Sequence, residues 1–156
     1  MDQHQSEEIL DAIAAEAFGA LLETRQIPPF SLRPPGLTVE DAYRVTPRVR
    51  QMYEARGARA IGRKIGFTNR TIWQQYGVYA PIWGHVFDRS VQDIADGDTI
   101  SLRAFSEPRI EPEIIFGLAA APSAGMDEAE LSSCIGWVAA GFEIVRRTRP
   151  YRNPFG

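Results

Sequence analysis

Two acidic residues separated by a single position are the feature of this chain with the clearest chemistry. Glu111 and Glu113 flank Pro112 within the isoleucine-rich segment that runs from Pro108 to Phe116. Such a segment is typical of a β-strand, where residues i and i+2 point to the same face. Two carboxylates held close together repel unless a cation lies between them. The spacing therefore favours a site for a hard divalent ion such as Mg²⁺ or Mn²⁺, which prefers oxygen ligands.

The alternative is an ordinary amphipathic strand whose two acids face solvent. Against it, Ile110 and Ile114 lie on one face of the expected strand and Ile115 lies on the other. Apolar residues on both faces predict a buried strand, and buried acids need partners. Pro112 has no N–H to donate to a neighbouring strand, so we also expect an edge strand or a local irregularity there.

Glu143 is a candidate third ligand. It lies in the apolar run at 137–145, which also reads as a strand. With Glu111 and Glu113 it would complete a site of three carboxylates. Taken alone, Glu143 fits a single carboxylate that is satisfied within its own strand better than a metal ligand.

Lys64 is the only lysine of the chain, whose other basic residues are all arginines. The bias toward arginine fits the codon usage of a GC-rich genome. Lysine, however, offers a compact charge and an adjustable pKa that arginine lacks. Most lysines are surface residues, so Lys64 alone is a weak signal. Gly62 and Gly66 bracket it in an apolar segment, which strengthens the alternative of a constrained, inward-facing cation.

Three further residues carry weaker signals. Asp88 fits either a turn or an acid that supports a site. His85 fits a packed histidine better than a metal ligand. Cys134 has no histidine partner that can be recognised in the sequence, so a nucleophilic role is not expected.

The bulk properties exclude several classes of protein. A length of 156 residues predicts one domain with its own core. The net charge of −3 argues against nucleic-acid binding. The acidic, polar start is unlike a signal peptide, and no apolar run approaches the roughly 20 residues of a membrane span. We therefore expect a cytoplasmic protein with neither a nucleic-acid nor a membrane partner.

The periodicity predicts helices first and strands later. We expect one helix at 6–24 and a second at 39–56, kinked or broken at Pro47 and ended by Gly57. The rest of the chain is predicted to be mostly extended, with short helices at 69–76 and 126–133. Strands or extended segments are expected at 60–66, 81–87, 99–103 and 109–118, and around Glu143.

Five motifs, taken in order, resemble one family. They are Gly-Arg-Lys-Ile-Gly-Phe-Thr at 62–68, Gln-Gln-Tyr-Gly-Val at 74–78, Gly-His-Val-Phe-Asp at 84–88, Pro-Arg-Ile-Glu-Pro-Glu at 108–113 and Gly-Phe-Glu-Ile-Val at 141–145. Together they are similar to the hydratase/decarboxylase branch of the fumarylacetoacetate hydrolase superfamily, which includes 2-oxopent-4-enoate hydratase and 4-oxalocrotonate decarboxylase. The resemblance covers the chain from about residue 38 onward, and the first helix more loosely.

The resemblance implies a fold of the α+β class, with N-terminal helices followed by part of a mixed β-roll. Residues 1–57 are expected to form the helical N-terminal region, and residues 58–156 the start of the mixed β-roll. The resemblance further implies Glu111, Glu113 and Glu143 as ligands of Mg²⁺ or Mn²⁺. Lys64 and Asp88 correspond to catalytic residues of the family.

The implied activity is that of a lyase. It adds water to a 2-hydroxy-2,4-dienoate, or its 2-oxo-4-enoate form, to give a 4-hydroxy-2-oxo acid during the breakdown of aromatic compounds. A 4-oxalocrotonate-type decarboxylase is the alternative. Two departures from the family pattern, Arg89 after Asp88 and Ile82 before the Trp-Gly pair, leave the substrate and the proton-transfer group open.

Family members continue well past residue 156, so we expect residues 1–156 to form a single, incomplete catalytic domain. The expected partners are a small 2-oxo or 2-hydroxy dienoic acid and either further copies of this chain or a complementing chain. A non-catalytic subunit that needs such a partner is the competing interpretation.

Overall fold

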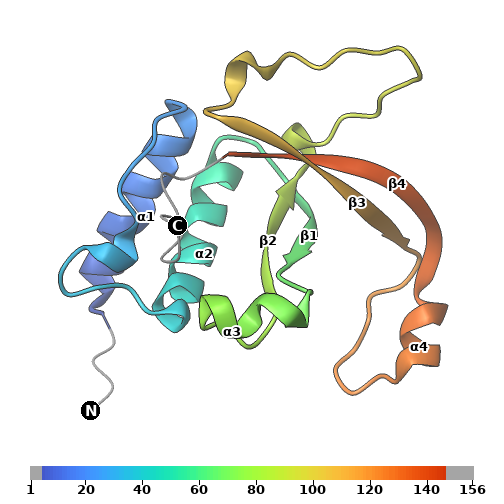
Figure 1. The fold of residues 1–156 in the computed structure, drawn as a ribbon, viewed down its shortest axis with the longest axis horizontal. Coiled ribbons are helices and arrows are strands. Elements are labelled where there is room, and N and C mark those ends of the chain that lie inside the picture. The colour runs from blue at the N-terminus through green and yellow to red at the C-terminus, as the bar shows by residue number, and fades with distance from the viewer. Residues whose placement is uncertain (1–4, 147–156) are drawn as a thin grey trace. The chain divides into compact units, whose positions relative to one another are not determined.

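The computed structural model describes residues 5–146, and their contacts form two compact units. The first unit ends at Ile100 and the second begins at Ser101 (Figure 1). The single domain expected from the sequence, with its boundary between residues 57 and 58, stays a prediction. The last long helix of the first unit does end close to that boundary, at Ala55.

Two helices form the core of the first unit. Helix α1 (Glu7–Leu22) begins where the Ser6 hydroxyl accepts a hydrogen bond from the backbone N–H of Ile9. Helix α2 (Val39–Ala55) begins in the same way at Thr38. Side-chain oxygens at these positions satisfy N–H groups that have no partner within the helix. The buried centre of the pair is formed by Leu10, Ala14 and Val45.

Pro47 does not divide the second helix, which runs unbroken from Val39 to Ala55. The helix is therefore not broken there, and the kink that was the other expectation stays a prediction. A proline removes one backbone hydrogen bond, but the packing of Val45 and Val49 against the other helix spans the position. Gly57 follows the helix with a φ of +81°, the left-handed conformation expected of a glycine at a helix end.

Strands β1 (Ala60–Gly66) and β2 (Ile82–Phe87) form an antiparallel pair, at the positions that the sequence predicts. Aromatic side chains of α2 cover one face of this pair: Tyr43 stacks on Trp83, and Tyr53 stacks on Phe87. The segment between the strands contains a 3₁₀ turn (Arg70–Ile72), which the Asn69 side chain caps, followed directly by helix α3 (Trp73–Tyr76).

The second unit is built on a long antiparallel hairpin (Figure 1). Strand β3 (Pro108–Leu118) pairs with β4 (Ile135–Arg146), and helix α4 (Glu128–Ser133) lies in the connection between them. Asp127 and Glu130 cap α4 reciprocally, each accepting a hydrogen bond from the backbone N–H of the other.

Two sequence-based expectations fail around this hairpin. The strand expected at 99–103 is absent, because residues 102–104 form a 3₁₀ turn capped by the Ser101 hydroxyl. Strand β3 is not buried, since both Ile110 and Ile114 are largely exposed. Its pairing with β4 alone, among the described residues, agrees with the edge position that Pro112 predicts.

Helices of the described region are all too short or too polar to cross a membrane. The mixture of helices and antiparallel strands confirms the predicted α+β class.

Candidate metal centre

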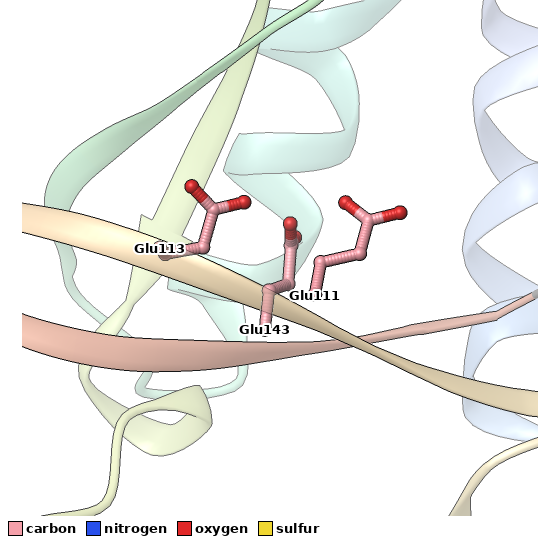
Figure 2. Close-up of side chains that lie close together, drawn as sticks. All are labelled: Glu111, Glu113 and Glu143. Carbon is pink, nitrogen blue, oxygen red and sulfur yellow. The ribbon is translucent and has the colours of Figure 1, made fainter.

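The three glutamates selected from the sequence come together on one face of the β3–β4 hairpin. Glu111 lies directly opposite Glu143 in the strand register, and Glu113 is two positions further along β3. Each offers one carboxylate oxygen, and these three oxygens lie within 4.8 Å of one another. Figure 2 shows the three side chains rising from the same side of the paired strands.

Alternation along the strands accounts for this convergence. Residues i and i+2 share a face of a strand, and directly paired residues of neighbouring strands share a face of the sheet. The first rule brings Glu111 and Glu113 together, and the second adds Glu143. The predicted irregularity does not fall at Pro112: the register shifts instead at 117–118, beyond the carboxylates.

Glycines leave space for large side chains on the same face. A Cβ on Gly141, opposite Glu113, would lie 2.5 Å from Cδ1 of Ile115. A Cβ on Gly117 would lie 1.8 Å from the ring of Trp137. Ile115 and Trp137 therefore lie over positions where a Cβ would collide with them. The carboxylates lie between this apolar part of the face and Arg109, which alternation places on the same face of β3.

The donor set fits a hard divalent cation. Glu113 and Glu143 are half-buried and Glu111 is exposed, so the cluster is shielded from water on one side and open on the other. Three carboxylates this close repel one another, and a cation among them removes that repulsion. Carboxylate oxygens are the preferred ligands of Mg²⁺, Ca²⁺ and Mn²⁺.

Lys64 belongs to the first unit and lies in the middle of β1. It pairs with Gly84 of β2, and its side chain is half-buried, as the sequence predicts for a constrained cation. The strand alternation places Lys64 on the face opposite the one that carries Trp83 and Phe87, which α2 covers.

Asp88 follows the end of β2 and forms hydrogen bonds that join the two strands. Its carboxylate accepts from the backbone N–H of Arg59 at 3.0 Å and from the Arg59 guanidinium at 3.2 Å. It also accepts from the backbone N–H of Arg89. These bonds, led by the one from the Arg59 backbone, hold the pKa of Asp88 below its ordinary value. The Asp88 carboxylate therefore joins the strand ends through Arg59, and the catalytic role that the resemblance implies for it stays a prediction.

His85 is a packed histidine, as the sequence predicts, and the absence of a nucleophilic role for Cys134 stays a prediction. His85 packs edge-on against Trp83, and burial lowers its pKa, so the ring is neutral at pH 7. Cys134 is buried at the end of α4. Neither residue joins the carboxylate cluster.

Comparison with curated proteins shows similarity to two kinds of enzyme. The chain is 34% identical over 131 residues to a 2-hydroxyhexa-2,4-dienoate hydratase of Comamonas testosteroni, covering 82% of the chain and 49% of the relative. It is also 34% identical over 105 residues to a 4-oxalocrotonate decarboxylase of Pseudomonas sp. strain CF600, covering 67% of the chain and 39% of the relative. The chain thus spans about half the length of these relatives or less. No protein-family model matches it.

The fold is that of a solved relative. It matches 4-oxalocrotonate decarboxylase from Pseudomonas putida G7, complexed with magnesium and adipate, with a TM-score of 0.86 and 27% identity over 97% of this chain and 57% of that one. A second structure of the decarboxylase, complexed with calcium and acetate, matches with a TM-score of 0.81. These comparisons confirm the predicted resemblance to the hydratase/decarboxylase branch.

Proposed function

We propose that this chain, a relative of dienoate hydratases and 4-oxalocrotonate decarboxylases, carries the metal-binding half of a lyase that hydrates a 2-hydroxy-2,4-dienoate. The reaction proceeds through the 2-oxo-4-enoate and adds water across the remaining carbon–carbon double bond. The product is a 4-hydroxy-2-oxo acid. The observation that carries the proposal is the cluster of Glu111, Glu113 and Glu143, in a chain similar to these enzymes.

In this proposal the three glutamates hold Mg²⁺ or Mn²⁺. Two structures of one solved relative, complexed with magnesium and with calcium, support a divalent ion, and the carboxylate donor set suits Mn²⁺ as well. When bound, the ion supplies a Lewis acid that polarises an oxygen of a 2-oxo acid. The glutamates themselves hold and orient the ion.

Lys64 supplies a second positive charge. Its Nζ donates hydrogen bonds to the substrate carboxylate or 2-oxo oxygen, or carries a proton between substrate and water. Lys64 lies between two glycines of β1, in the middle of the strand.

The lowered pKa of Asp88 keeps its carboxylate ionised at neutral pH. A carboxylate that stays ionised cannot donate a proton at neutral pH, so its role is either to accept one or to hold Arg59 and the strand ends in place. The hydrogen bonds to Arg59 favour the second role, which makes Asp88 a positioning residue.

The second candidate reaction is decarboxylation of 4-oxalocrotonate. The curated decarboxylase relative and the solved decarboxylases favour it. A third candidate, a subunit that is active only with a complementing chain, is favoured by the length, since relatives are about twice as long. We also propose that the chain forms an oligomer or such a complex.

The test is ultraviolet-monitored consumption of 2-hydroxypenta-2,4-dienoate by the purified chain with Mg²⁺, with Mn²⁺ and with excess chelator. We expect metal-dependent conversion to the 4-hydroxy-2-oxo acid. Metal-dependent loss of CO₂ from 4-oxalocrotonate, without hydration, would replace the hydratase by the decarboxylase. Absence of both activities, with light scattering showing aggregates, would favour the partner-dependent subunit.

A further inference from the structure

One face of the β1–β2 pair is rich in glycine. The face turned away from α2 carries six residues, of which three are glycines, and Lys64 is the only charged one. They are Gly62, Lys64 and Gly66 on β1 and Ile82, Gly84 and Val86 on β2. Lys64 faces Gly84 across the strands, and the two apolar residues lie at the two ends.

Neither packing nor backbone conformation requires two of these glycines. A Cβ on Gly62 or on Gly84 would meet no atom within 4 Å. Neither residue has a positive φ, so alanine fits the backbone of both. Gly117 and Gly141 in the other hairpin differ, since a Cβ there would collide with a side chain. Glycine weakens the interior of a strand, and where it occurs another molecule or backbone often approaches closely.

The lysine side chain leaves two glycines uncovered. Cε of Lys64 lies 3.9 Å from the place that a Cβ on Gly66 would take. The side chain therefore extends over Gly66, while no side chain of residues 5–146 covers Gly62 or Gly84. The result is a flat surface of peptide groups beside an ammonium group, which we name the glycine floor (Gly62 and Gly84).

We propose that the glycine floor determines substrate specificity: it binds the planar, conjugated chain of the acid while Lys64 binds its carboxylate. This inference rests on the proposed function, because it assigns the substrate of that enzyme to this surface. A conjugated chain is flat and lies closely against peptide groups only where no Cβ rises between them. A saturated chain is puckered and gains less from such a floor.

Two six-carbon dicarboxylates test the proposal by binding alone. Muconate (hexa-2,4-dienedioate) is conjugated and planar, and adipate is its saturated, flexible counterpart. Calorimetric titration of the wild-type chain with Mg²⁺ present is expected to give tighter binding of muconate. Gly84→Ala should weaken muconate binding about tenfold and adipate binding by less than about twofold, and Gly84→Val should abolish muconate binding.

Gly19→Ala is the matched control. Gly19 lies within α1, and a Cβ there also meets no atom within 4 Å. This variant should bind muconate as the wild type does. Circular dichroism is expected to show Gly84→Ala unfolding at the wild-type temperature or above it, so that weaker binding cannot be attributed to unfolding.

Three outcomes would overturn the inference. Equal affinity of wild type and Gly84→Ala for muconate would remove the floor from the binding site, while metal-dependent turnover in the same preparation would leave the proposed function standing. A change of oligomeric state in Gly84→Ala, measured by light scattering, would show that polypeptide rather than substrate covers the floor. Failure of the wild type to bind muconate, to bind Mn²⁺ and to consume dienoate would end the proposed function together with the inference.

Discussion

The two hairpins of this chain are built alike and covered differently. One face of β1–β2 receives Tyr43 and Tyr53 from α2. Strands β3 and β4 place their carboxylates on one face and a row of apolar residues on the other. That row is exposed, with Ile114 at 69% and Phe142 at 62% of their full accessibility. It consists of Ile110, Ile114, Phe116, Val138 and Phe142.

The difference shows where each hairpin obtains its stability. A two-stranded hairpin is marginally stable in water unless something packs on it. The first hairpin finds its packing partner, α2, in its own unit. The second exposes a contiguous apolar face, which is typical of a surface that binds other polypeptide. Its metal-binding face can thus be complete while its opposite face is not.

The largest expected effect concerns the carboxylate face. Glu113→Gln should lower the affinity for Mn²⁺ by about 100-fold or more, because it removes one charged ligand and keeps the side-chain shape. Titration calorimetry measures the affinity. Glu128→Gln, at an exposed acid at the start of α4, is the control and should bind Mn²⁺ as the wild type does. Undiminished binding by Glu113→Gln would remove this residue from the site.

The next largest effect is expected when the aromatic cover of the first hairpin is removed. Tyr53 contacts Phe18 edge-on at 4.9 Å and stacks on Phe87 at 4.4 Å between ring centroids. Tyr53→Ala should lower the free energy of unfolding by about 2 kcal/mol, measured by urea denaturation. Tyr79→Ala, at a tyrosine that is 68% exposed, should change it by less than about 0.5 kcal/mol. Equal effects of the two variants would mean that the aromatic cover does not support the hairpin.

A smaller effect depends on pH and concerns the helices that provide this cover. Asp41 is fully buried and accepts hydrogen bonds from Arg44 and from the backbone N–H of Gln5. Burial pushes its pKa up, but these bonds outweigh burial and leave the pKa below its ordinary value. The stabilisation is therefore complete above the ordinary value of about 3.9 and is lost as the pH falls through the folded-state pKa.

Asp41→Asn should consequently unfold at a temperature about 5 °C or more below that of the wild type at pH 7, with a smaller difference at pH 3. Thermal melts monitored by circular dichroism at both values measure this. A difference that does not shrink in acid would assign the loss to packing rather than to the charge of Asp41.

The smallest effect on folding is expected at the exposed apolar face of the second hairpin. Ile114→Lys and Phe142→Lys should alter the free energy of unfolding by no more than about 0.5 kcal/mol, since both positions are exposed. They should nevertheless reduce self-association or partner binding, measured by light scattering. Leu32→Lys, at a residue 78% exposed outside both hairpins, is the control. Strong unfolding by Ile114→Lys would show that the face is already packed.

Local features of the fold could be read from the sequence. Ser6 and Thr38 mark helix starts because their hydroxyls bond to N–H groups within three residues. The strand that carries Glu111 and Glu113 was also recognisable, because alternation is a local property. The prediction at 99–103 failed because a strand exists only with a partner, and none is present there among the described residues.

Burial was the least predictable property. Apolar residues on both faces of β3 predicted a buried strand, yet Ile110 and Ile114 are exposed. Burial depends on what else packs nearby, which the composition of one strand does not contain. The role of Asp88 is similar: its partner Arg59 lies 29 positions away, and only the pairing of β1 with β2 brings them together.

The sequence by itself determined that Glu111 and Glu113 share one face, because two-residue alternation follows from the geometry of an extended chain. The tertiary structure decided that Glu143 faces Glu111, because the register between strands is set by contacts along their whole length. It likewise decided that Gly84 lies beside Lys64, where two strands distant in sequence create a surface without side chains.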